Sequence, residues 1–178
     1  MSKNEFKKGD FVVYPAHGVG EVKKIVSEKF GDEKLSLIVV DFSKNRMTLR
    51  IPLDKIEISG LRKLTTKKEM NEIVEILKEA PQSKRIIWSR RAQMYDDKIN
   101  SGEPEKVAEV VRDLYRNEKK DEQSFSERQI YQKALGRLAN EYATIMGQDP
   151  EKTILKLETS MEESPDRQIK SEENEIDE

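Results

Sequence analysis

The only tryptophan of the chain, Trp88, lies within a run of basic residues, a combination that could grip a nucleic acid. The cations around it are Lys84, Arg85, Arg90 and Arg91. Cationic side chains neutralise phosphates without regard to base sequence. An indole can stack on a base or enter between base steps, and stacking contributes about 1 to 3 kcal/mol per base. The cluster therefore predicts a contact with nucleic acid.

The same tryptophan also fits the buried stripe of an ordinary amphipathic helix. If one helix runs through this region, Trp88, Ala92, Tyr95 and Ile99 follow one another at helical spacing. Side chains at this spacing share one face, which in a globular protein packs against the core. The residues alone leave both interpretations open, an exposed wedge and a buried stripe.

Composition argues against an enzyme. The chain has no cysteine, which removes disulfides and thiolate zinc sites, and His17 is its sole histidine. No nucleophile, base and orienting group can be assembled from this set, so no cofactor, metal or small-molecule substrate is expected. Acidic pairs such as Asp96-Asp97 are interpreted as solvated helix faces, because 38% of the residues are charged.

No apolar run approaches the length of a membrane span, and the N-terminus lacks the pattern of a signal peptide. A cytoplasmic protein without membrane contact is therefore expected. Charge is uneven: from Glu158 to Glu178 nine acids oppose two bases, a net of −7, which leaves +5 for the rest of a chain of net charge −2. An acidic tail could weaken nucleic-acid binding by competition, or it could simply stay solvated.

Residues 6–64 show the short, punctuated pattern of a small β domain. Strands are expected at residues 11–14, 22–26, 35–42, 47–51 and 56–58, with 35–42, the most apolar run, in the centre. Five short strands leave no room for crossover helices. An antiparallel sheet curled into a small SH3-like or Tudor-like barrel is therefore predicted.

Within residues 47–51 polar and apolar residues alternate, so Thr48 and Arg50 should face away from the apolar side of the sheet. An exposed guanidinium can pair with a carboxylate through two hydrogen bonds and anchor a protein interface. A solvated surface arginine is the alternative interpretation.

From residue 65 the pattern becomes helical. Thr66-x-x-Glu69 is a capping box that starts a helix ended by Pro81, and a second helix should run from near residue 83 or 88 to Asn100. A third helix should begin at Pro104 and bury its valines at 107, 110 and 111. The capping box Ser126-x-x-Gln129, with residues 125 and 130 as a hydrophobic staple, predicts a fourth, and a short fifth should end near residue 157.

The predicted organisation is thus an α+β chain in two domains. Residues 1–64 form the β-barrel, residues 65–158 form a compact helical bundle, and residues 159–178 form a disordered acidic tail. Within the bundle, Lys133 and Arg137 lie four residues apart and would extend the basic surface begun by Arg90 and Arg91.

Four separated blocks resemble the CarD/CdnL family of bacterial transcription regulators. They are GDFVVYPAHGVGEV at residues 9–22, MTLRIP at 47–52, WSRR at 88–91 and KVAEVVRDL at 106–114. The resemblance covers about residues 6–157. The first block alone is also similar to the polymerase-interacting domain of the transcription-repair coupling factor, but this chain has no room for that protein's helicase motor.

The resemblance implies that the barrel binds the β-subunit lobe of RNA polymerase. Arg50 matches the family arginine used against polymerase, and Thr48 and Lys29 are candidates beside it. A second basic position of better-known members is Glu28 here, so the charge is reversed at that point.

The resemblance also implies that the helical domain binds promoter DNA at the upstream edge of the melted bubble, as a monomer associated with the nucleoid through polymerase. Trp88 would enter the minor groove and hinder closure of the bubble, without reading sequence and without a cofactor. The cations expected to bind phosphates are Arg90, Arg91, Lys84, Arg85, Lys133 and Arg137, whereas a further basic position of the family is Gln93 here. An adaptor that bridges polymerase to another protein, without functional DNA contact, is the alternative.

Overall fold

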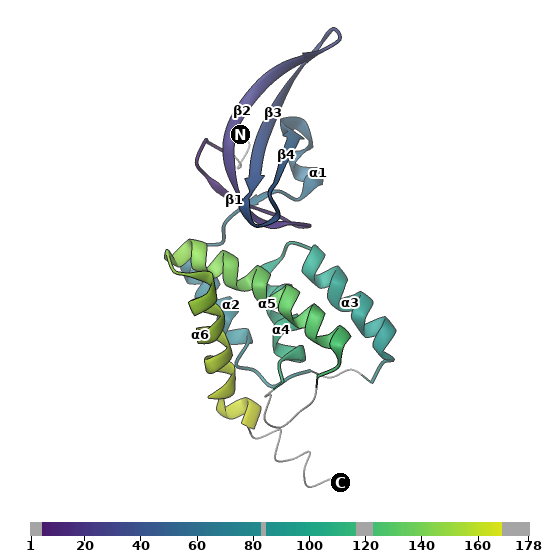
Figure 1. The fold of residues 1–178 in the computed structure, drawn as a ribbon, viewed down its shortest axis with the longest axis vertical. Helices are drawn as coiled ribbons and strands as arrows, with labels where there is room; N and C mark the ends of the chain where they lie inside the picture. The colour runs from purple at the N-terminus through teal and green to yellow at the C-terminus, as the bar shows by residue number, and fades with distance from the viewer. Residues whose placement is uncertain (1–4, 83–84, 117–122, 169–178) are drawn as a thin grey trace. The chain divides into compact units, whose positions relative to one another are not determined.

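The computed structural model describes residues 5–82, 85–116 and 123–168 (Figure 1). The chain forms two compact units, Met1–Leu64 and Thr65–Glu178. The first unit is built on a β-sheet and the second is helical, which confirms the α+β organisation predicted from the sequence.

The sheet of the first unit has five antiparallel strands in the order β4-β3-β2-β1-β5. The strands are β1 (Phe11–Tyr14), β2 (Gly18–Phe30), β3 (Glu33–Phe42), β4 (Met47–Pro52) and β5 (Arg62–Lys63). β3 is an interior strand, but the middle place belongs to β2, which pairs with β3 in a long curved hairpin (Figure 1). β4 and β5 are the two ends of the strand order, so closure into a Tudor-like barrel stays a prediction.

The fifth strand was predicted at the wrong place. Residues 56–58 belong to the short helix α1 (Ile56–Ser59), which buries Ile56 and leaves Ile58 87% exposed. Gly60 ends this helix with a φ of 74°, a left-handed conformation that glycine adopts without strain. Three residues of alternating polarity fit a turn of helix as well as a strand, which is why the pattern misled.

The backbone at Gly20 lies very close to side chains of the core of the first unit. The buried core beneath the sheet consists of Phe6, Val12, Val22, Ile38, Val40, Phe42, Ile51, Ile56 and Leu61. A Cβ at Gly20 would lie 2.7 Å from side-chain carbons of both Val40 and Phe42. β2 therefore passes this core at a distance that only glycine permits.

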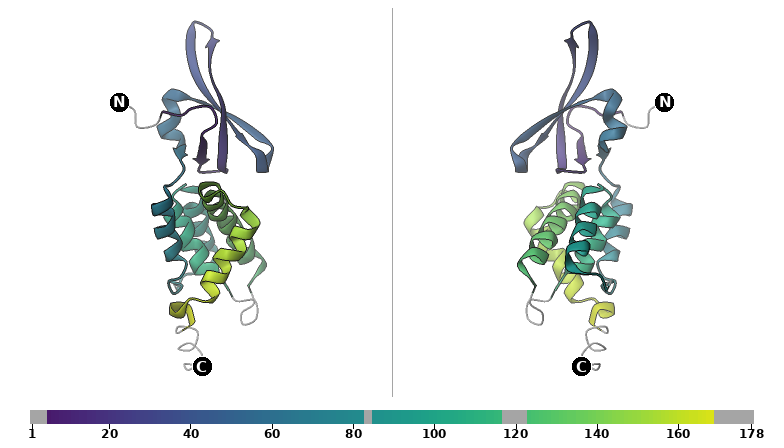
Figure 2. Two further views of the ribbon diagram at one scale, coloured as in Figure 1. Left: turned by 90° about the vertical axis from the view of Figure 1, so that its left-hand side faces the viewer. Right: turned by 90° about the vertical axis from the view of Figure 1, so that its right-hand side faces the viewer.

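The second unit packs five helices side by side around one core (Figure 2). They are α2 (Lys67–Ile76), α3 (Trp88–Asn100), α4 (Pro104–Leu114), α5 (Phe125–Met146) and α6 (Pro150–Glu162). The predicted capping box of α2 is present, and α4 begins at Pro104 and buries its predicted stripe. No helix in the described segments is long and apolar enough to cross a membrane.

The start of α5 differs from the prediction. Ser124 is the N-cap and forms the capping box with Glu127, two residues earlier than expected. Phe125 is 76% exposed and is not part of a staple. Two overlapping sequences, Ser124-x-x-Glu127 and Ser126-x-x-Gln129, both satisfy the motif, and the pattern alone does not choose between them.

The chain stays ordered beyond residue 159, contrary to the prediction for the tail. Helix α6 continues to Glu162 because Leu157 and Met161, four residues apart, are both buried in the core. A further helical turn follows at residues 165–168, and Ser164 is buried. The rest of the acidic tail, residues 169–178, lies outside the described residues.

Two glycine substitutions should have opposite effects. Gly20→Ala should destabilise the first unit by about 1–3 kcal/mol, because the added methyl group overpacks the core. Gly136→Ala, within α5 where a Cβ meets nothing within 4 Å, should stabilise the second unit by about 0.5–1 kcal/mol. Urea denaturation of each variant measures both effects, and a stable Gly20→Ala protein would contradict the close approach.

Candidate nucleic-acid interface

Trp88 is the first residue of α3, and the cap of this helix is unusual. The N-cap residue is Ile87, whose apolar side chain cannot cap the helix; among the described residues no side chain does so, and the first turn contains no acid. The first N–H groups of a helix have no partner within the helix, and they carry the positive end of its dipole. The start of α3 is therefore suited to an anion.

The indole of Trp88 is partly buried and packs against the helical core. The ring centroid of Tyr95 lies 6.4 Å from that of Trp88, at an interplanar angle of 49°. Within the helical stripe that runs from Trp88 to Ile99, Tyr95 and Ile99 are buried. Trp88, at the end of the stripe, keeps part of its surface in solvent. The structure thus combines the two interpretations that the residues left open.

Arg91 supports the indole from its own helix. Its guanidinium carbon lies 5.3 Å from the centroid of the Trp88 ring, a cation–π contact. Its Nη2 lies 3.6 Å from Oε1 of Glu127, the capping-box residue of α5. Arg91 is therefore held between the indole and the start of α5, and less of its charge is available to solvent than that of Arg90.

Ile87 is the apolar residue that the sequence analysis missed. Its side chain is 73% exposed directly beside Trp88. The signal was available, because an apolar triplet, Ile86-Ile87-Trp88, interrupts a basic run just before a helix starts. Exposed apolar surface bordered by charge is typical of a binding site.

The cations predicted to bind phosphates differ in how freely their charges are exposed to solvent. Arg85 and Arg90 are exposed, and neither forms an ion pair with another residue that the structure describes. Lys84 lies outside the described residues. The pair of free arginines at this site is thus Arg85 and Arg90, on either side of the apolar surface.

On α5, Lys133 lies next to α3 but is already paired. Its Nζ lies 3.1 Å from Oδ1 of Asp96, so this acid is part of the surface between two helices. Arg137 is partly buried, and burial lowers the pKa of its guanidinium. Neither side chain is presented to solvent as freely as Arg90.

The candidate polymerase contact in the first unit carries an internal ion pair. Arg50 projects from β4 on the exposed side, as predicted, and its Nη1 donates to Oε1 of Glu28 on β2 at 3.0 Å. Thr48 lies on the same side of β4 and donates to Asp41 at 3.3 Å. Lys29 follows Glu28 on the strand and so points to the opposite side, away from Arg50.

Within the described residues, no group of three or more histidine, cysteine or acidic side chains could hold a metal ion. The features that remain are an apolar and cationic surface at the start of α3 and a charged surface on the sheet.

Both units of the chain match known protein families. Residues 6–65 match the family model for the CarD-like/TRCF RID domain, and residues 72–158 match that for the CarD C-terminal domain. The chain belongs to the CarD/CdnL family. A relative described as "Putative transcription factor YdeB", from Bacillus subtilis (strain 168), is 34% identical over 142 residues, which is 80% of this chain and 93% of the relative.

A solved structure of the family is also similar in sequence to part of this CarD-family chain. It is the solution NMR structure of the 72-residue N-terminal domain of Myxococcus xanthus CarD, which is 27% identical and covers 35% of this chain and 84% of that one, with a TM-score of 0.30.

Removing the negative charge of Glu127 should loosen the indole of Trp88, because that charge holds Arg91 against the ring. Glu127→Gln keeps a side chain that can serve in a capping box, so it should cost at most about 1 kcal/mol of stability. Trp88 is the only tryptophan, so its fluorescence reports directly on this site. Acrylamide quenching should increase in Glu127→Gln and stay unchanged in Arg128→Ala, an exposed neighbour on α5. Equal quenching in wild type and Glu127→Gln would show that Arg91 does not depend on this pair.

Proposed function

We propose that this chain is a transcription regulator that binds the RNA polymerase β subunit and promoter DNA, and stabilises the open complex without reading base sequence. The observation that carries the proposal is the exposed apolar surface of Ile87 and Trp88 at the start of α3, with free arginines at 85 and 90. Membership of the CarD/CdnL family supports the same assignment.

The geometry suits the edge of a melted bubble in the minor groove. Apolar side chains that enter the minor groove separate base steps and hold DNA in a distorted form. At the edge of a bubble the bases are already unstacked, so the energetic cost of this insertion is low there. Ile87 and Trp88 offer such a wedge, and the degenerate hydrogen-bonding pattern of the minor groove gives them little base sequence to read.

Phosphate contacts would come from the arginines next to the wedge and from the start of α3. Arg85 and Arg90 are exposed, and the uncapped helix start presents backbone N–H groups to an anion. Lys133 can add a contact only if its pair with Asp96 opens. Arg91 acts chiefly on the indole, and Arg137, which is partly buried, is a weaker candidate for a phosphate contact than Arg90.

The mechanism requires no chemistry. A ligand that binds the open complex more tightly than the closed one shifts the population toward the open state by that difference in affinity. Because the two units belong to one chain, binding of the sheet unit to polymerase raises the local concentration of the helical unit at the DNA. Two weak contacts then give high occupancy only where both partners are present.

The wedge is tested by the lifetime of the open complex on a promoter challenged with competitor DNA. Trp88→Ala should remove an interaction of about 1–3 kcal/mol, and should shorten the lifetime roughly fivefold or more. Leu155→Ala is the matched control, because it also removes an exposed apolar side chain but on α6. Equal lifetimes for Trp88→Ala and wild type would eliminate the wedge, and absence of crosslinks from position 88 to promoter DNA would favour the adaptor role.

The salt dependence of DNA binding tests the arginines separately. If Arg90 binds one phosphate, Arg90→Ala should lower the slope of log affinity against log salt by about 0.9. The measurement is a fluorescence titration with forked promoter DNA at several salt concentrations. An unchanged slope would show that Arg90 does not bind a phosphate.

The sheet unit is tested by binding to core RNA polymerase. Arg50→Ala should weaken binding, whereas Glu28→Gln should strengthen it, because Glu28 competes with polymerase for the same guanidinium. The gain should not exceed about fivefold, since an exposed ion pair contributes at most about 1 kcal/mol. The double variant should bind like Arg50→Ala alone. Weaker binding of Glu28→Gln would instead mean that Glu28 itself contacts polymerase.

A further inference from the structure

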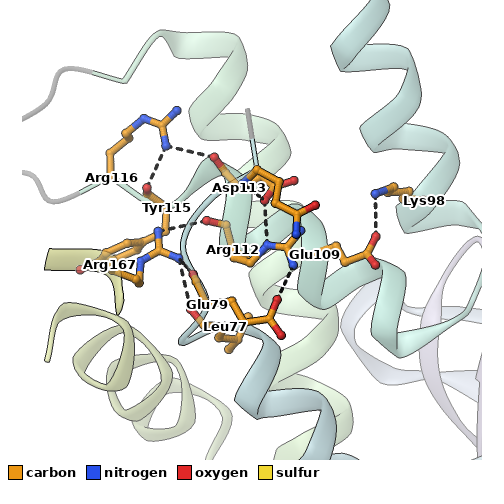
Figure 3. A network of polar contacts seen from close by, with 10 residues as sticks. Leu77, Glu79, Lys98, Glu109, Arg112, Asp113, Tyr115, Arg116 and Arg167 are labelled. Carbon is orange, nitrogen blue, oxygen red and sulfur yellow. Dashed lines mark hydrogen bonds and ion pairs between the residues drawn. The ribbon is translucent and has the colours of Figure 1, made fainter. Parts of the chain in front are cut away.

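A partly buried arginine near the end of the described chain, Arg167, reaches back to the residues that follow α2. Arg167 donates from Nη1 to the carbonyls of Leu77, at 3.2 Å, and Glu79, at 3.1 Å (Figure 3). Its Nη2 donates to the carbonyl of Arg112 at 3.0 Å, and its guanidinium lies over the ring of Tyr115. The side chain of Arg167 therefore connects the residues just after α2 with the last turn of α4.

These contacts satisfy carbonyls of the turn that follows α2, whereas the last carbonyls of α2 itself accept the N–H groups of Leu77, Lys78 and Glu79. α2 ends at Ile76 with Leu77 as C-cap, in right-handed conformation and without the glycine that commonly closes a helix. Ser164 donates its hydroxyl hydrogen to the carbonyl of Lys78. Residues 164 and 167 thus supply partners for the carbonyls of Leu77, Lys78 and Glu79, which follow the last helical residue of α2.

The same network continues into the connection between α2 and α3. Arg112 donates from Nη1 to Oε2 of Glu79 and from Nε to Oδ1 of Asp113, both at 2.8 Å. Oδ1 of Asp113 also accepts the backbone N–H of Gln82 at 3.0 Å. Arg112 and Asp113 are buried, so these bonds form in an environment where they are strong. They hold residues 79 and 82, a few residues before Ile87.

Hydrogen bonds are needed there because packing supports the connection only in part. A cavity of about 260 Å³ is bordered by Gln82, Arg91 and Asp113, among others. Residues 85–87 follow, without helix or strand, and lead directly to Trp88. The position of the wedge therefore depends on how firmly residues 77–82 are held.

We infer that residues 163–168 form a clip that holds residues 77–82, at the start of the α2–α3 connection, with Arg167 as a positioning residue for the wedge at Ile87 and Trp88. The family model ends at residue 158, so the clip lies beyond the matched C-terminal domain. The effect on DNA rests on the proposed function, whereas the effect on the connection does not.

Hydrogen exchange of the full chain tests the clip without DNA. Arg167→Ala should accelerate amide exchange in residues 77–87 roughly tenfold, the effect of losing one or two net hydrogen bonds, while the buried amides of α5 exchange as in wild type. Ser164→Ala should show a smaller acceleration in the same segment. Arg167→Lys keeps the charge but cannot reach three carbonyls, and should be intermediate. Asp166→Ala, exposed in the same turn, is the control and should change nothing.

Two results would overturn the clip: unchanged exchange in residues 77–87, or equal acceleration throughout the helical unit. The open-complex lifetime then tests the link to DNA. Arg167→Ala should shorten it, but less than Trp88→Ala does. If Trp88→Ala shortens the lifetime and Arg167→Ala does not, the positioning role is wrong although the proposed function stands. If Trp88→Ala has no effect either, the proposed function fails, and the exchange data alone decide the clip.

Discussion

The buried pair of Arg112 and Asp113 at the end of α4 is the interaction on which the helical unit most depends. Both side chains are almost fully enclosed, yet each also binds a residue before α3, Glu79 and Gln82. Removing one partner of a buried pair leaves an uncompensated charge and costs about 3–5 kcal/mol. Such a pair contributes little net stability but tolerates only one arrangement of the chain around it. The same bonds therefore restrict the positions of residues 79 and 82, which precede Trp88 in the chain.

Internal pairing also determines which cations can bind DNA. Arg91, Lys98 and Lys133 each lie beside an acid of a neighbouring helix. These pairs hold α3 against α4 and α5, and they reduce the positive field of the bundle. Arg85 and Arg90 remain exposed without such partners among the described residues. A small number of free cations would give weak binding to DNA in general, which is consistent with the proposal that polymerase determines where the protein acts.

Local signals predicted much of this fold, and contacts between distant residues explain what they missed. A proline at the first turn and a valine stripe were sufficient to predict α4, and the capping box was sufficient to predict where α2 begins. The environment of Trp88 was ambiguous because helical spacing does not say where the core ends. Arg50 was correctly expected on the exposed side, but its pair with Glu28 spans 22 residues. Arg167 looked like part of a solvated tail, since the carbonyls that it binds lie between 55 and 90 residues earlier.

The partial burial of Trp88 makes it a better wedge than a fully exposed indole would be. A free side chain samples several rotamers, and ordering it on binding costs about 0.5–1.5 kcal/mol. Contacts with Tyr95 and Arg91 already select one orientation, so less of this cost remains when DNA binds. The surface left in solvent, continued by Ile87, is what can enter between bases. The proposed function therefore requires both burial on one side, which fixes the ring, and exposure on the other, which lets the ring contact DNA.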